Sequence, residues 1–286
     1  TSAGVVASQT QIPGPSTFTI SAWFKTTTHS GGKIVGFGDA NTGNSGSYDR
    51  HIYMDNSGKI YFGVYPGSVQ TVTSAKSYND GAWHQVVASL GAGGMTLFLD
   101  GQKVGSLGSV TTAQDYSGYW RIGGDNLNGW TNQPSSSYFA GSIDDVAIFP
   151  TALTSPTVRN EYLAAGYSIA GVPPAPADAY GADVYNLDPD LYWRLGDPTG
   201  ATMAADAGAY QNPGVVNGAV GFGATGALTG VTDTAAQFDG AAAYLVSSNQ
   251  AAGPTTYSTS AWFKTTTTAG GKIIGFGDAA TGVSSI

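Results

Sequence analysis

The chain contains no cysteine, few charged residues and no long apolar run, and each absence removes a class of protein. The lack of cysteine among 286 residues excludes disulfides, thiolate metal sites and cysteine nucleophiles. Charged residues make up 10% of the chain, the net charge is −8 and no run of Lys or Arg occurs, so we expect no nucleic-acid partner. No stretch of about 18 apolar residues is present, so we expect no membrane insertion.

Groups for acid-base or nucleophilic catalysis are also scarce. Glycosidases need two carboxylates held about 5 Å apart, whereas the only glutamate, Glu161, falls in a predicted helix. The three histidines, His29, His51 and His84, have no accompanying nucleophile motif. We therefore expect a protein that is not an enzyme and has no catalytic residues.

The residues that are abundant favour short strands joined by tight turns. The chain has 42 Gly and 16 Tyr, and it is also rich in Ser and Thr, a composition that indicates an all-β fold. Such a composition without cysteine suits a bacterial protein that is secreted or displayed on the cell surface.

A long internal repeat divides the chain. Residues 15–43 recur as residues 254–282 with 21 of 29 positions identical, and Trp23 corresponds to Trp262, an offset of 239. A repeat of this length indicates a whole domain rather than a solenoid unit. In this register residue 1 corresponds to a position inside one copy, and residue 286 to a position inside the next.

Local patterns predict individual elements. Residues 18–25 alternate between apolar and polar side chains, as in a half-buried strand, and Asp100-Gly101 predicts a two-residue hairpin turn. Residues 143–149 are largely apolar on both faces and predict a central buried strand. Ser155 as cap, Pro156 in the first turn and Gly166 at the end predict one short helix near 155–165.

The composition changes over residues 172–189, which are rich in Pro, Ala and Asp and predict a semi-extended linker. Residues 191–195, Leu-Tyr-Trp-Arg-Leu, then begin the next copy of the repeat, and residues 248–286 duplicate the first strands.

Three segments together resemble laminin-G-like, concanavalin A-like jelly-roll domains: residues 82–106 with their Trp-His and Leu-Phe-Leu-Asp-Gly motifs, residues 119–124, and residues 138–162 with Gly-Ser-Ile-Asp-Asp-Val. Residues 191–197 and 235–240 resemble the opening half of such a domain. The resemblance implies a sandwich of two antiparallel sheets, often with bound calcium, and sugar or protein ligands.

The resemblance also implies that residues 1–171 form a sandwich that lacks its opening strands, since the opening strand is expected beside the closing one. We predict that residues 190–247 fill this gap, from the same chain or a neighbouring one, giving a permuted or strand-swapped sandwich.

Two polar clusters are candidates for ligand binding. The loop carrying Asp125, Asn126, Asn128 and Trp130 offers carboxylate and amide groups for sugar hydroxyls and an aromatic ring for stacking. Tyr48, Asp49 and Arg50 form a second cluster of this kind. Alternatively, Trp130 plugs the end of the sandwich and the asparagines form turns.

Asp144 and Asp145, together with Asp206 of the opening segment, are candidate ligands for a structural calcium ion. The resemblance implies an ion near Asp206, although residues 207–210 read Ala-Gly-Ala-Tyr where relatives usually continue Ser-Gly-Asn-Gly. The alternative is that backbone amides or Arg194 satisfy these carboxylates.

We therefore predict a non-catalytic module of an extracellular repeat protein that binds a glycan or a surface protein in adhesion. The alternative is an architectural repeat of a stalk, fibre or filament, assembled by strand exchange and self-association between neighbouring repeats.

Overall fold

The computed structural model describes residues 4–251, 253–255 and 257–279. The chain divides into two compact units, Thr1–Tyr167 and Ser168–Ile286. No helix in the described ranges is both long and apolar enough to cross a membrane.

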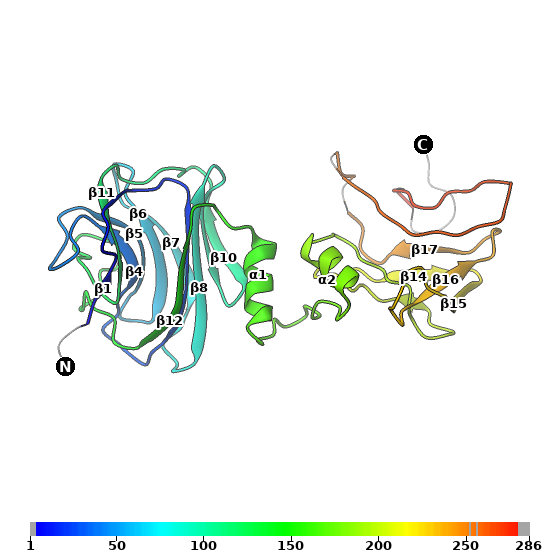
Figure 1. The fold of residues 1–286 in the computed structure, drawn as a ribbon, viewed down its shortest axis with the longest axis horizontal. Helices are drawn as coiled ribbons and strands as arrows, with labels where there is room; N and C mark the ends of the chain where they lie inside the picture. Colours follow the sequence, from blue (N-terminus) through cyan, green and yellow to red (C-terminus); the bar gives the residue numbers. More distant parts are fainter. Residues whose placement is uncertain (1–3, 252, 256, 280–286) are drawn as a thin grey trace. The chain divides into compact units, whose positions relative to one another are not determined.

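The first unit is an antiparallel two-sheet sandwich (Figure 1). One sheet has seven strands in the order β1-β11-β4-β5-β6-β7, with β2 also paired to β11, and the other has five in the order β10-β9-β8-β3-β12. The strands are β1 (Val6–Ala7), β2 (Ile12–Pro13), β3 (Phe18–Lys25), β4 (Gly32–Gly38), β5 (Tyr48–Met54), β6 (Lys59–Val64), β7 (Gln70–Ser77), β8 (Trp83–Gly91), β9 (Gly94–Leu99), β10 (Gln102–Leu107), β11 (Ser117–Ile122) and β12 (Ser142–Phe149).

Alternating side chains build the core between the sheets. In β3, Phe18, Ile20, Ala22 and Phe24 are fully buried and belong to the main hydrophobic cluster, which also draws residues from β4, β5, β6, β8 and β9. The predicted fold class, an all-β jelly-roll sandwich, is confirmed.

The predicted hairpin turn after β9 is also confirmed. Asp100 and Gly101 have φ values of 52° and 73°, and Leu99 pairs with Gln102 across the turn. Left-handed conformation at both central residues matches the right-handed twist of the flanking strands, which is why Asp-Gly serves here.

The predicted short helix is α1 (Ser155–Ala164), with Gly166 just after its end at φ 86°. Its cap is Thr154 rather than the predicted Ser155, because the Thr154 side chain accepts from the Thr157 amide. Val158 packs against Val87 and Phe98, so α1 covers the outer face of the five-stranded sheet.

The prediction of a central buried strand over residues 143–149 is wrong in its position. Among the described residues, β12 pairs only with β3 and forms an edge of its sheet, with Asp144 and Asp145 exposed. A bulge between Asp144 and Ala147 interrupts the ladder, and Asp145 has a φ of 44°. The two acids therefore lie in solvent at the sheet edge and need no buried partner.

The second unit contains α2 (Ala179–Asn186) and two small antiparallel sheets. Their strands are β13 (Met203–Ala204), β14 (Gly214–Asn217), β15 (Val220–Thr225), β16 (Thr234–Phe238) and β17 (Tyr244–Ser247). The sheets have the orders β13-β14-β17 and β15-β16. Completion of the first sandwich by residues 190–247 stays a prediction.

Three predictions for the second unit need correction. The linker over 172–189 is not extended throughout, because Asp178 caps α2 by accepting from the Gly181 amide. Residues 191–195, expected among the opening strands, form a single bridge between Trp193 and Asp206. The duplicated region 248–286 forms no strand among its described residues; residues 252, 256 and 280–286 lie outside the described residues.

Candidate functional site

The two predicted ligand clusters meet at one place. Tyr48 begins β5, and its hydroxyl donates to the carbonyl of Asn128 at 2.9 Å. Asn128 belongs to the segment of residues 125–137, which we call the covering loop because it lies on the outer face of the seven-stranded sheet. The site therefore combines a strand end and a loop that are distant in the sequence.

Asp125 anchors the beginning of the covering loop. Its side chain is fully buried, and Oδ1 accepts from the backbone amides of Ser45 and Asn126 at 2.9 and 2.8 Å. Oδ2 lies 3.5 Å from Nζ of Lys33, which is also fully buried. The carboxylate thus ties the covering loop both to residues 39–47 and to β4.

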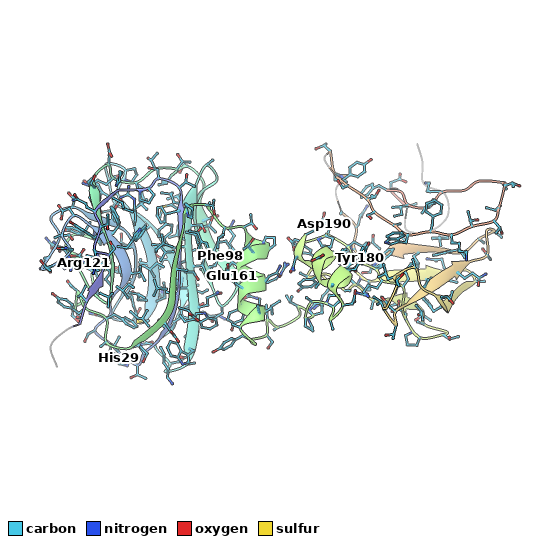
Figure 2. The ribbon with its side chains drawn as sticks, in the orientation of Figure 1. His29, Phe98, Arg121, Glu161, Tyr180 and Asp190 are labelled. Atoms are coloured by element: carbon cyan, nitrogen blue, oxygen red, sulfur yellow. The ribbon has the colours of Figure 1, made fainter. Side chains whose placement is uncertain are left out.

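Arg121 of β11, labelled in Figure 2, supports the same corner. Its NH1 and NH2 groups donate to the carbonyls of Ala40 and Gly43 at 2.6 and 2.7 Å, and NH1 lies 3.7 Å from Asp125 Oδ1. Only 2% of the residue is exposed, so this cation serves the fold rather than a surface ligand.

Asp49 and Arg50 are a buried ion pair, with Arg50 NH1 2.5 Å from Asp49 Oδ1. Asp49 Oδ2 accepts from the amides of Tyr65 and Gln114 at 3.1 and 2.9 Å. Arg50 Nε and NH2 donate to the carbonyls of Pro15 and Gln114 at 2.8 and 2.7 Å. Arg50 holds a φ of 45°, and these contacts compensate for that rarely adopted backbone conformation.

Trp130 seals the outer face of the sheet. It is 6% exposed, and its ring meets the ring of His51 edge-on at a centroid distance of 4.0 Å. Gly63 of β6 makes room for it, because a Cβ at Gly63 would lie 2.5 Å from Trp130 Cζ3. Tyr53 and Tyr61 stack beside it, 4.9 Å apart.

Burial shifts the pKa values of the groups under the covering loop. It lowers the pKa of Lys33 to about 8, although Asp125 opposes the shift. Burial also lowers the pKa of His51 well below its usual value, and the Lys33 charge adds to this effect. The pKa of Asp49 is raised by burial, with Arg50 opposing the change.

Exposure separates the predicted ligand residues into two groups. Asn128 is exposed, and Asn126 and Tyr48 are half-buried, so these three reach the surface. Asp125, Trp130, Asp49 and Arg50 are buried and contact other parts of the protein. Trp130 is buried, as in the alternative that made it a plug, but it covers the outer face of the seven-stranded sheet rather than the end of the sandwich. The Asn126 side chain forms a turn, as that alternative expected, by accepting from the Asn128 amide at 3.0 Å.

The predicted calcium ligands belong to separate units of the chain. Asp144 Oδ1 accepts from the Asp145 amide at 3.0 Å, and both residues belong to the first unit. Asp206, in the second unit, accepts three backbone amides, from Tyr192, Gly208 and Asn212. Within the described ranges no three His, Cys, Asp or Glu side chains gather as a metal site requires.

Lys33, Arg121 and the buried position of His51 were not part of the predicted site. Lys33 lies in a glycine-rich apolar strand. A lysine in such a strand indicates that an acidic partner lies nearby, since lysine is almost never fully buried without one. Nothing in the sequence identifies that partner as Asp125, which lies 92 residues further along the chain.

Comparison with known proteins gives the family. The sequence profile of the concanavalin A-like lectin/glucanases superfamily matches residues 1–159, more than half of the chain. No curated protein matches the chain.

Three solved structures are similar to this chain in fold. A heptameric SAP-like pentraxin of Limulus polyphemus has 19% identity and a TM-score of 0.43, over 55% of this chain and 75% of that one. The CBM40 of the Ruminococcus gnavus IT-sialidase has 17% identity and a TM-score of 0.38, over 51% and 82%. Domains LG4-5 of the mouse laminin alpha1 chain have 18% identity and a TM-score of 0.39, over 53% and 40%.

At these identities the solved structures show a shared fold alone, and their TM-scores carry no argument about a ligand. The family assignment rests on the profile match and agrees with the two antiparallel sheets of the first unit. The chain belongs to the concanavalin A-like lectin/glucanases superfamily.

Proposed function

We propose that the first unit is a non-catalytic glycan-binding module of a secreted or surface-displayed adhesion protein. Its contact surface is the rim formed by Tyr48, Asn126 and Asn128. The observation that carries the proposal is the hydrogen bond from the Tyr48 hydroxyl to the backbone carbonyl of Asn128, which places a half-exposed ring beside a loop that carries two side-chain amides. An aromatic face beside amides is the combination that sugar recognition uses.

The buried charges beneath the rim support this assignment. Asp125 and Arg121 hold the loops in place without offering their own charges to solvent. A rim held in this way loses little conformational entropy on binding, which favours recognition of a weakly binding ligand such as a sugar.

The absence of catalysis is part of the proposal. Glu161, labelled in Figure 2, lies on α1, where burial raises its pKa. It has no second glutamate as a partner, because the sequence contains no other. Incubation with the bound glycan should therefore release no sugar product.

The test is binding to a glycan array, followed by titration calorimetry with any sugar that binds. Tyr48→Ala and Asn128→Ala should each weaken binding by about tenfold, since one stacking or bidentate polar contact is worth about 1–2 kcal/mol. Tyr48→Phe keeps the ring and should have a smaller effect. Gln102→Ala, at an exposed position on β10, is the matched control and should bind as the parent does.

Wild-type affinity in Tyr48→Ala and Asn128→Ala would place the ligand elsewhere. An array without any binding sugar would contradict the function itself and would direct attention to protein ligands.

A second candidate, an architectural repeat, is favoured by the open edge of β12. In the described part of the chain this strand pairs on one side only, while Ile143, Val146 and Ile148 pack into the core. Such an edge can accept a strand from a neighbouring repeat. Light scattering that shows concentration-dependent polymers, together with no sugar binding, would favour this candidate.

We also propose a structural calcium ion at Asp144 and Asp145, supported by the adjacent, exposed carboxylates at the bulge of β12. Calcium should raise the unfolding temperature of the parent but not that of Asp144→Asn/Asp145→Asn. An equal response in both proteins would exclude these residues as the ligands.

A further inference from the structure

His51 is a buried histidine without a polar partner. It is fully buried on the outer face of the seven-stranded sheet, and among the described residues neither ring nitrogen has a hydrogen-bond partner. Its ring contacts are aromatic, with Trp130 at a centroid distance of 4.0 Å and Tyr53 at 5.4 Å. Such a site accepts the neutral imidazole and offers nothing to accept a hydrogen bond from the protonated form.

The charges around His51 also oppose its protonation. The ionisable groups around this place include Lys33 of β4, Asp49, Arg50 and Tyr53 of β5, Tyr61 of β6, Arg121 of β11, Asp125 of the covering loop, and Tyr48 at the start of β5. They also include Asp55, whose Oδ2 accepts from the Tyr61 hydroxyl at 3.2 Å, and Tyr116, whose hydroxyl donates to Asp49 Oδ1 at 3.2 Å. Lys33 lies with His51 beside Gly36, since a Cβ at Gly36 would lie 2.7 Å from His51 Cβ and 3.0 Å from Lys33 Cδ.

The anions at this place are already engaged. Asp125 is the carboxylate near both Lys33 and Arg121, at 3.5 and 3.7 Å, and Asp49 is paired with Arg50. A proton on His51 would therefore add a third buried cation beside Lys33 and Arg121, while the carboxylate that lies near both of them, Asp125, is already shared between them. Burial and then Lys33 lower the pKa of His51, in agreement with this count.

The cover over His51 is one segment of loop without strand pairing. Leu127 and Trp130 are buried against Tyr53 and Tyr61 and close the site. Three hydrogen bonds involving tyrosine hydroxyls hold the covering loop, namely Tyr48 to the Asn128 carbonyl at 2.9 Å, Tyr53 to the Thr131 carbonyl at 2.6 Å, and Asn132 Nδ2 to Tyr61 at 2.5 Å. These are neutral bonds that water can replace. The two ends of the loop are held more firmly, by Asp125 at the start and by the backbone bonds of Ser136 and Ser137 to Ser30 and Lys33 at the finish. The middle of the loop, residues 127–132, can therefore leave without unfolding either sheet.

We propose that the covering loop is an acid-released cover, in which protonation of His51 drives Leu127 and Trp130 off the outer face of the sheet. The direction follows from linkage. The contribution of neutral His51 to closure is present above its ordinary pKa of about 6.5 and is lost as the pH falls toward its lower folded value. Because the loop carries Asn126 and Asn128, acid also releases a ligand from the rim; this last consequence rests on the proposed function.

Hydrogen exchange read by mass spectrometry tests the proposal on the whole chain without any ligand. After correction for the intrinsic effect of pH, amides of residues 127–132 in the covering loop should exchange at least about tenfold faster at about pH 5 than at about pH 7.5. Peptides from β3 should keep their protection at both values. In His51→Phe, which keeps an aromatic ring against Trp130 but cannot take a proton, the loop should not respond to pH.

Two further variants complete the test. His84→Gln removes a titrating histidine that pairs with Asp80 and Asp100, so its covering loop should still open in acid. His51→Asn replaces His51→Phe if the latter does not fold. The proposal is overturned by equal loop protection at both pH values, by an acid response that persists without His51, or by equal loss of protection in β3.

Ligand release is read separately, as weaker glycan binding at about pH 5 in the parent and unchanged binding in His51→Phe. If no glycan binds at any pH, the proposed function is contradicted. The hydrogen-exchange result still shows whether acid opens the covering loop.

Discussion

Residues 18–38 and 257–277 have nearly the same sequence but different surroundings. In the first copy Phe24, Ile34 and Phe37 are fully buried within β3 and β4. In the second copy the corresponding residues, Phe263, Ile273 and Phe276, are 67%, 58% and 61% exposed, and this segment contains no strand.

The two copies have similar local strand propensity but differ in whether neighbouring strands are present. In the first copy β3 lies between β8 and β12, and β4 lies between β5 and β11. The described part of the second copy has no such neighbours, so its backbone groups have no ladder to join. The same alternating pattern therefore produces a core strand only when both neighbours are present.

The largest expected effect comes from removing one phenyl ring from each copy. Phe24→Ala should lower the free energy of unfolding of the first unit by about 3–5 kcal/mol, because it leaves a cavity in the sandwich core. Phe263→Ala should change it by less than about 0.5 kcal/mol, since that ring is already in solvent. Urea-induced unfolding, followed by loss of amide protection in β8, measures both.

Similar decreases in the free energy of unfolding for Phe24→Ala and Phe263→Ala would mean that the second copy is also packed in solution. The two copies would then not differ in burial.

Lys33 and Lys272 occupy equivalent positions in the two copies, and only Lys33 should make the free energy of unfolding depend on pH in the alkaline range. Burial lowers the pKa of Lys33 from 10.5 to about 8, so the unfolded chain binds more protons between these values and stability rises as the pH increases through them. The full rise due to Lys33 is about 3 kcal/mol. It should be absent from Lys33→Met and unchanged in Lys272→Met, because Lys272 is exposed.

Urea unfolding at several alkaline pH values gives the free energy of unfolding of the parent and of each variant. Subtracting the two values at each pH removes the contribution of the tyrosines, because all of the proteins contain them. A Lys33→Met protein with the same pH dependence as its parent would show that Lys33 is not buried as a cation.

A smaller decrease in the free energy of unfolding is expected when a residue of the second copy is placed at the equivalent position of the first. Ile20 is fully buried in β3, whereas the second copy has Thr259. Ile20→Thr should cost the first unit about 2 kcal/mol, because it removes apolar contact and buries a hydroxyl. Strand β3 should nevertheless keep its amide protection in hydrogen exchange. Its loss would mean that the threonine, and not the missing neighbours, prevents strand formation in the second copy.

Short-range patterns predicted much of the first unit. The Asp100-Gly101 turn, the alternation of Phe18–Lys25 and the helix between Thr154 and Gly166 all depend on residues a few positions apart. The same patterns did not predict α2, because the prolines in residues 172–176 favour an extended chain, whereas Asp178 caps a helix directly after them.

The candidate site was predicted only in part, since the roles of its residues depend on distant contacts. The sequence indicated polar clusters at Tyr48 and at Asn126 and Asn128, and the structure joins them through one hydrogen bond. It could not indicate that Asp125 would be enclosed between Ser45 and Lys33, or that Trp130 would lie against His51.

The sequence by itself determined the family, the β-rich class and the turns, because composition, motif order and residue-specific backbone preferences are local properties of the chain. Only the tertiary structure decided which polar residues reach solvent, which aromatic rings are covered, and which copy of the repeated peptide becomes a strand. The physical reason is that burial and strand pairing require groups from distant parts of the chain, so identical residues take different states when those groups are present or missing.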